Sequence, residues 1–235
     1  MDALQAVAET VTSGKSLKRR NMLWLVAVGI VDVIALLVIA FHRPVDDFTP
    51  DRLTALRGSL TVFLPVPILF LSYLLSHSQK AVVVFWRLRN PMPGSRAFSV
   101  HAPADSRIDM ETLKKHIGEF PGDERSQNAM WYRLYKLVEN DVSVLESHQK
   151  YLMFRDIAAM SILLVPLVPF ALFLFGNKPP AVVLSAAVFA VQYLITAVAA
   201  RNSGVRFVQN VLCIHATKKV AAPRRVPKHK PEDKG

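Results

Sequence analysis

Four apolar stretches, each of about twenty residues, constrain the fold of this chain more than any other feature. They cover residues 22–41, 59–76, 156–175 and 181–200. A helix of about twenty apolar residues is long enough to cross the hydrocarbon core of a bilayer. A single stretch could be the buried helix of a soluble core, but four of them in 235 residues leave too little chain to cover them. The pattern therefore predicts four transmembrane helices.

The distribution of basic residues predicts the orientation of these spans. Of the 29 Lys and Arg residues, 25 lie in three places: before the first span, between the second and third, and after the fourth. Lys and Arg near the ends of spans stay on the cytoplasmic side. Both termini are therefore expected in the cytoplasm, and the expected location is a plasma membrane, most simply a bacterial inner membrane. Trp24 and Trp86 flank spans and are expected to anchor them at the interface.

The expected fold class is an all-α integral membrane protein with a small helical cytoplasmic domain between the second and third of four transmembrane helices. The chain divides into a cytoplasmic N-terminal segment (1–21), a first transmembrane hairpin (22–76), the cytoplasmic helical domain (77–155), a second transmembrane hairpin (156–200), a juxtamembrane helix (201–216) and a disordered basic tail (217–235).

Capping residues and apolar spacing predict helices in the cytoplasmic domain. Asp109 and Asp123 can each cap a short helix, and Gly118 can end the first of them. A third helix is expected to begin near Asp141 and to continue without a break into the third span. The apolar stripe over 131–138 is expected to pack in a core, with a partner-binding face as the alternative.

The segment after the fourth span carries apolar residues at helical spacing. It is expected either to continue that helix into the cytoplasm or to lie on the bilayer as an amphipathic helix. The tail that follows is rich in Pro and basic residues, and basic residues beside a membrane attract anionic lipids. The absence of aromatic residues among these charges disfavours nucleic acid as the partner. The residues expected to bind lipid are Lys218, Lys219, Arg224, Arg225, Lys228 and Lys230.

One acidic residue, Asp32, lies near the middle of the first span. A carboxylate at that depth costs roughly 2.5–3.5 kcal/mol on insertion scales unless it is neutralised or paired. Gln192 lies at a similar depth in the fourth span, so the two residues form the expected intramembrane polar site. The alternatives are an ion or substrate site and a pair that only fixes helix packing. Prolines expected to kink the second and third spans lie at the same depth: Pro65, Pro67, Pro166 and Pro169.

No catalytic motif stands out in the sequence. His101 and His116 lie near Asp105 and Asp109, but their spacing matches no common metal site, and no phosphate-binding loop or nucleophile elbow is present. His77, His101, His116 and His148 are each expected to be ordinary surface residues. The expected protein has no enzymatic activity, no cofactor and no metal ion.

These features predict a non-catalytic multi-pass membrane protein whose cytoplasmic domain docks a protein partner or senses a cytosolic signal, in a helix bundle that can form a homo-oligomer. The alternative is a small transporter or channel in which Asp32 lines the path.

Overall fold

The computed structural model describes residues 21–36, 38–39, 74–174 and 178–218. Within these residues every regular element is helical, so the all-helical class is confirmed. The elements are an apolar helix Asn21–Leu36, α4 (His77–Phe85), the 3₁₀ helix η2 (Pro93–Arg96), the π-helix η3 (Ala97–His101), α5 (Met110–Ile117), α6 (Glu124–Val138), α7 (Val142–Leu174) and α8 (Pro179–Thr217).

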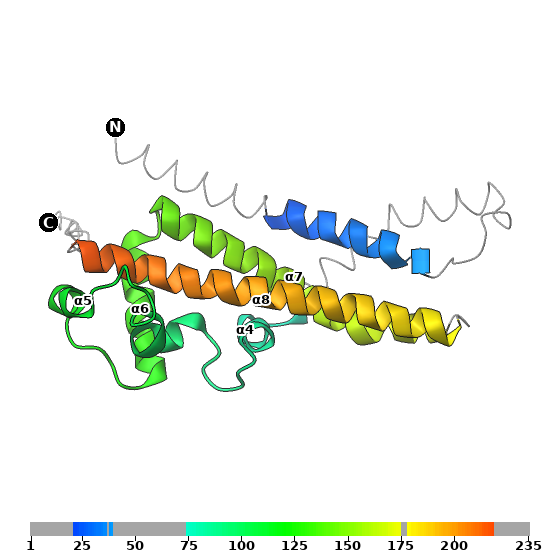
Figure 1. The fold of residues 1–235 in the computed structure, drawn as a ribbon, viewed down its shortest axis with the longest axis horizontal. Coiled ribbons are helices and arrows are strands. Elements are labelled where there is room, and N and C mark those ends of the chain that lie inside the picture. Colours follow the sequence, from blue (N-terminus) through cyan, green and yellow to red (C-terminus); the bar gives the residue numbers. More distant parts are fainter. Residues whose placement is uncertain (1–20, 37, 40–73, 175–177, 219–235) are drawn as a thin grey trace, which may run out of the picture.

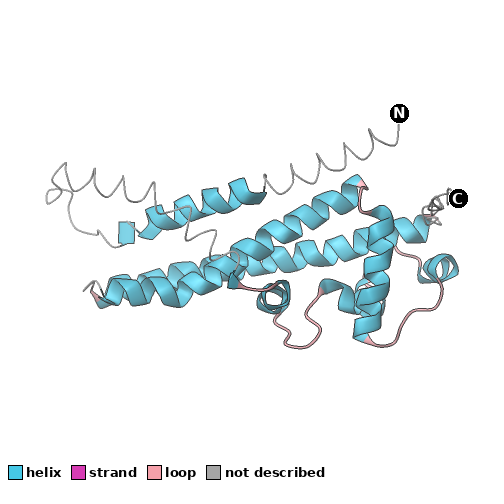
Figure 2. Ribbon diagram, turned by 180° about the vertical axis from the view of Figure 1, so that it is seen from behind, coloured by secondary structure: helices cyan, strands magenta, loops and turns pink. Residues whose placement is uncertain are grey.

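Two long helices, α7 and α8, run side by side in opposite directions through the whole molecule (Figures 1 and 2). They contain 33 and 39 residues, which at 1.5 Å per residue gives lengths of about 50 and 58 Å. Among the described residues these two helices are long and apolar enough to cross a membrane. Both have an apolar half, near the connection between them, and a polar half beyond it.

The other two predicted spans are less fully described. The first contains the apolar helix Asn21–Leu36, which lies alongside the apolar halves of α7 and α8 (Figure 1). Residues 59–73, most of the second predicted span, lie outside the described residues, as do Pro65 and Pro67. The structure therefore contains two of the four predicted spans as full-length apolar helices.

The polar halves of α7 and α8 carry a small helical unit, here called the cap, which consists of η2, η3, α5 and α6. Asp109 accepts hydrogen bonds from the amides of Glu111 and Thr112 at the start of α5, and Asp123 caps α6 through the amide of Ser126. Gly118, with φ of +92°, ends α5. Both short helices and the start of α7 thus lie where the sequence predicted them.

The apolar stripe of α6 packs against α8, which confirms the core interpretation. Trp131 is buried, and its ring meets the edge of Phe207 at a centroid distance of 5.1 Å. α8 continues unbroken past residue 200, and Val208, Val211 and Leu212 are fully buried beneath the cap. Of the two expectations for residues 201–216, the structure has the continued helix, because the apolar stripe is covered by protein.

A short helix, α4, crosses the long pair where their apolar halves meet their polar halves; Figure 1 shows it end-on beside α8. Ser76 caps α4 and Trp86, with φ of +53°, ends it. Lys80 of α4 forms an ion pair with Asp156 of α7 at 3.0 Å, and Arg155 donates to the same carboxylate. This cluster fixes α4 across α7.

The expectation of surface histidines is wrong for His101, which is 7% exposed, and for the half-buried His148. His148 stacks on Phe207 at a centroid distance of 4.5 Å. Burial, reinforced by Arg155 and Lys136, lowers the pKa of His148 to about 4. Burial and the nearby Arg96, Arg201 and Arg87 lower the pKa of His101 to about 4 as well.

Replacing Gly94 by Ala should destabilise the cap. A Cβ atom at Gly94 would lie 2.5 Å from Cε3 of the buried Trp131 and 2.6 Å from Oδ1 of the half-buried Asn128. Overpacking of this kind costs about 1–3 kcal/mol, so the melting temperature should fall. Gly122→Ala is the matched control, because a Cβ there meets nothing within 4 Å. Equal melting temperatures for the two variants would contradict this packing.

Acidification from pH 7 to pH 5.5 should lower the melting temperature. The pKa values of His101 and His148 lie near 4 in the folded chain, below the unfolded value of about 6.5. The unfolded chain therefore binds more protons over this range, and the free energy of unfolding falls as the pH falls. His148→Phe keeps the aromatic stack and removes one of the three described histidines whose pKa burial lowers, so it should flatten the dependence. Parallel curves for the variant and the original chain would count against this assignment.

Candidate functional site

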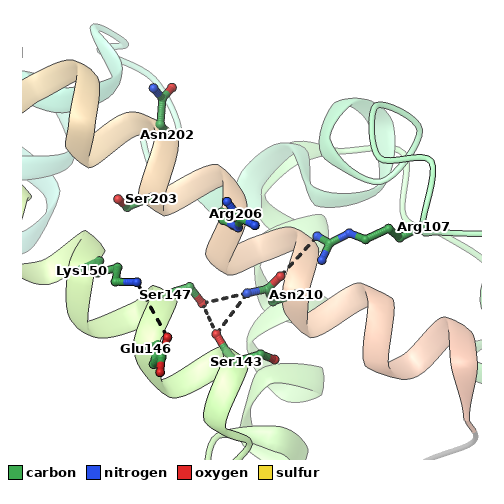
Figure 3. Close-up of a pocket in the computed structure, with 9 residues that line it drawn as sticks. All are labelled: Arg107, Ser143, Glu146, Ser147, Lys150, Asn202, Ser203, Arg206 and Asn210. Carbon is green, nitrogen blue, oxygen red and sulfur yellow. Dashed lines mark hydrogen bonds and ion pairs between the residues drawn. The ribbon is translucent and has the colours of Figure 1, made fainter.

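A polar hollow of about 510 Å³ lies between the polar halves of α7 and α8 (Figure 3). We call it the α7–α8 hollow. A second hollow of about 520 Å³ adjoins it on the neighbouring face of α8 and shares Arg107, Asn202 and Arg206 with it. The α7–α8 hollow is lined by Arg107, Ser143, Glu146, Ser147, Lys150, Asn202, Ser203, Arg206 and Asn210.

Helical spacing explains how the sequence builds this hollow. Asn202, Arg206 and Asn210 recur every four residues along α8. On α7, Ser143 and Ser147 are four residues apart, and so are Glu146 and Lys150. Residues four apart lie on one face of a helix. Each helix therefore presents a polar strip, and the antiparallel pairing sets the two strips opposite each other. Arg107 enters from the connection between η3 and α5.

The floor of the hollow is a fully hydrogen-bonded asparagine. Asn210 is 8% exposed, and its Nδ2 donates to the carbonyl of Ser143 at 3.0 Å and to Oγ of Ser147 at 3.3 Å. Its Oδ1 accepts a hydrogen bond from Arg107 at 3.2 Å. Because both ends of the amide are used, Asn210 joins α7 to α8 and holds the guanidinium of Arg107 at the edge of the hollow.

Arg107 is also paired with an acid outside the α7–α8 hollow. Its Nε and Nη2 donate to the carboxylate of Asp105, with a closest distance of 2.7 Å. Those hydrogen bonds hold the pKa of Asp105 below its usual value, so the carboxylate stays ionised. The bidentate pair fixes the plane of the guanidinium and leaves Arg107 a positioned donor.

Two other cations line the hollow from opposite sides. Arg206 of α8 is exposed and forms no hydrogen bond or ion pair with any residue that the structure describes. Lys150 of α7 lies 3.7 Å from Glu146, and both side chains are more than 60% exposed. An exposed pair at that distance contributes little. Arg206 and Lys150 are thus both available to a ligand.

The chemistry of this site suits an anion. Guanidinium, ammonium, amide and hydroxyl groups line one space, with the carboxylate of Glu146 as its one acid. Charged donors of this kind make the strong hydrogen bonds of phosphate and carboxylate recognition. Within the described part of the chain, no group of three or more His, Cys, Asp or Glu side chains could hold a metal ion. The arrangement provides binding groups rather than a nucleophile beside a base.

The polar pair expected in the apolar region lies together in the structure. Asp32 is 6% exposed and lies beside Gln192, whose Nε2 donates to Oγ of the fully buried Ser161 at 3.2 Å. Oδ2 of Asp32 is buried without a hydrogen-bond partner among the described residues. Sequence reasoning missed Ser161, although it lies within the third apolar stretch, five residues after its start at Asp156.

The remaining predicted residues are placed as follows. Pro166 and Pro169 lie inside α7, which continues through both. Lys218 is exposed at the end of α8. The other residues expected to bind lipid, from Lys219 onwards, lie outside the described residues.

No protein-family model, curated protein or solved structure matches this chain. Two groups of residues stand out: the basic α7–α8 hollow in the polar halves of the long helices, and the smaller Asp32, Gln192 and Ser161 cluster in their apolar halves.

Proposed function

We propose that this chain is a non-catalytic, four-span protein of a plasma membrane, most simply a bacterial inner membrane, and that its cytoplasmic domain senses a cytosolic anion at the α7–α8 hollow. In this arrangement both termini lie in the cytoplasm. The apolar halves of α7 and α8 form the second transmembrane hairpin, and their polar halves form a stalk that carries the cap. The charge asymmetry of the sequence supports this orientation.

The position of the hollow carries this proposal. Its walls are the two helices that continue without a break from the cap into the apolar region. An anion held by Lys150 on one helix and Arg206 on the other neutralises both cations and draws the helices together at that level. Because each helix is continuous, a change in their separation or crossing at the stalk alters their packing in the bilayer. Helix shifts of about 1–2 Å are typical of such signals.

The proposed membrane arrangement also gives roles to the basic tail, to the exposed apolar faces of α7 and α8, and to a protein partner. The basic tail would hold the C-terminus at anionic lipid. The exposed apolar faces of α7 and α8, which include Leu167, Phe170, Leu194 and Ile195, would face lipid or a second copy of the chain. Docking of a cytoplasmic protein would be the output of the sensor rather than a separate activity.

Anion binding is tested with inorganic pyrophosphate and the full chain in detergent. Pyrophosphate should raise the melting temperature by mass action. Replacing Lys150 and Arg206 together by Gln should weaken binding at least tenfold, because a hydrogen bond to a charged group contributes about 1.5–3 kcal/mol. The control is Lys115→Gln with Arg133→Gln, two exposed cations away from the hollow. An equal response in all three proteins would overturn the site.

Sensing, as distinct from binding, is tested by measuring the distance between α7 and α8 with and without pyrophosphate. Spin labels at Leu174 and Leu184, both exposed in the apolar halves, report the separation of α7 and α8; Cys213 is first replaced by Ser. Pyrophosphate should shift the distance distribution by on the order of 1–2 Å in the reconstituted protein and leave the Lys150/Arg206 variant unchanged. Tight binding without any shift would leave a binding protein and remove the sensor.

A second candidate function, a small transporter or channel, is favoured by the unpartnered carboxylate oxygen of Asp32. If Asp32 binds a cation or relays a proton, Asp32→Asn should abolish ion or proton leak in liposomes while the helices still assemble. If Asp32 only packs against Gln192, Asp32→Leu should cost roughly 0.6 kcal/mol and leave function intact. Unchanged leak in both variants would remove Asp32 from the functional account.

A further inference from the structure

The loop that follows α4 exposes large apolar side chains among arginines. Trp86 is 51% exposed and Leu88 is 89% exposed, and they alternate with Arg87 and Arg89. Positive φ angles at Trp86 (+53°) and Asn90 (+46°) bracket this segment, so the backbone turns sharply at both ends. The described part of the chain leaves both apolar side chains exposed. A surface that is both apolar and basic therefore faces outward here.

Contacts of Trp86 place this loop at the junction between the apolar and polar halves of α8. Its Nε1 donates to the hydroxyl of Tyr193, in the apolar half, at 2.9 Å. The guanidinium of Arg201, the first residue of the polar half, lies 5.7 Å from its ring centroid. In Figure 1 the loop runs from α4 away from the axis of α8, toward the bottom of the view. If α7 and α8 cross a bilayer, as the proposed function holds, the loop lies at the level of the cytoplasmic headgroups.

A basic hollow of about 660 Å³ opens beside the loop, between it and α6. Its lining includes Leu88, Arg89, Arg125 and Asn128, together with Ser78 from the first turn of α4. Arg89 and Arg125 are exposed and form no ion pair with a described residue. Arg87, in contrast, pairs with Glu124 at 2.7 Å.

The ion pair of Arg87 has a structural role. Glu124 also accepts a hydrogen bond from Asn90 at 3.0 Å, so one carboxylate of α6 holds both ends of the segment 87–90. The loop is thereby positioned, and the two unpaired arginines remain on the side of the hollow. Among the described residues, no carboxylate pairs with Arg89 or Arg125.

We propose that this loop and Arg125 form a binding site for an anionic phospholipid of the cytoplasmic leaflet. Arg89 and Arg125 bind the phosphate of the headgroup, while Leu88 and Trp86 contact the glycerol and the first methylenes of the acyl chains. The exposed Leu88 at the rim distinguishes this site from one for a soluble phosphate, because a soluble anion would leave that side chain in water. The inference rests on the membrane placement in the proposed function and is separate from the pyrophosphate site.

The test uses the full chain in phosphatidylcholine nanodiscs with increasing brominated phosphatidylglycerol, which quenches tryptophan nearby. Subtracting the emission of the Trp86→Phe protein isolates the signal of Trp86. Quenching should saturate with phosphatidylglycerol, and removal of each arginine should raise the half-saturating fraction roughly fivefold. Arg89→Gln with Arg125→Gln is the variant, and Lys115→Gln with Arg133→Gln is the control, which should behave as the original chain.

A third variant guards against loss of folding. Leu88→Asn changes a side chain that is almost wholly exposed, so it should keep the melting temperature and still weaken the quenching. The inference is overturned if brominated phosphatidylcholine quenches Trp86 equally well, or if the arginine variant matches its control. It is also overturned if soluble glycerol phosphate abolishes the quenching by brominated phosphatidylglycerol. Release of the chain from membranes by alkaline carbonate would instead overturn the membrane placement, and with it the proposed function.

Discussion

The ion pairs of Asp156 with Lys80 and Arg155 are the interactions on which the arrangement of the molecule depends. The carboxylate of Asp156 accepts hydrogen bonds from Lys80 at 3.0 Å and from Arg155 at 2.9 Å, and both cations are buried. Removing one partner from a buried ion pair costs about 3–5 kcal/mol, because the remaining charge is left uncompensated. Here one acid serves two cations at the junction of the apolar and polar halves of α7. The chain direction of α4, and the loop that leaves it, follow from that anchor.

Close packing at the same level makes the long helices and the cap one body. A Cβ atom at Gly204 would lie 2.9 Å from Cζ of Phe85 in α4 and 3.0 Å from Tyr151 in α7, so three helices meet at a residue without a side chain. One turn further along α8, Phe207 packs on Trp131 and His148. The polar halves of α7 and α8 are thus packed directly against α4 and the cap.

The sequence predicted what depends on local pattern and, apart from the closeness of Asp32 and Gln192, missed what depends on the pairing of helices. Caps at Asp109 and Asp123 and the stripe containing Trp131 follow from spacing along one segment, and the structure has them. The α7–α8 hollow does not follow, because it needs the relative register of residues on α7 and α8 that are 63–67 positions apart in the sequence, and the arrival of Arg107 from a loop. The repeat of Asn202, Arg206 and Asn210 was the available signal, since polar residues every four positions mark a polar helix face.

Arg201 connects the two ligand sites that we propose. Its guanidinium lies over the ring of Trp86 in the loop, and it also lines the hollow that shares Asn202 and Arg206 with the α7–α8 hollow. One turn of α8 therefore faces the lipid site on one side and the soluble anion site on the other. Coupling between two sites is reciprocal. A lipid that fixes Trp86 against this turn and an anion that draws Arg206 toward α7 would act on the same backbone, so the two proposed sites would be coupled, and the lipid composition of the membrane would then alter the affinity for the anion.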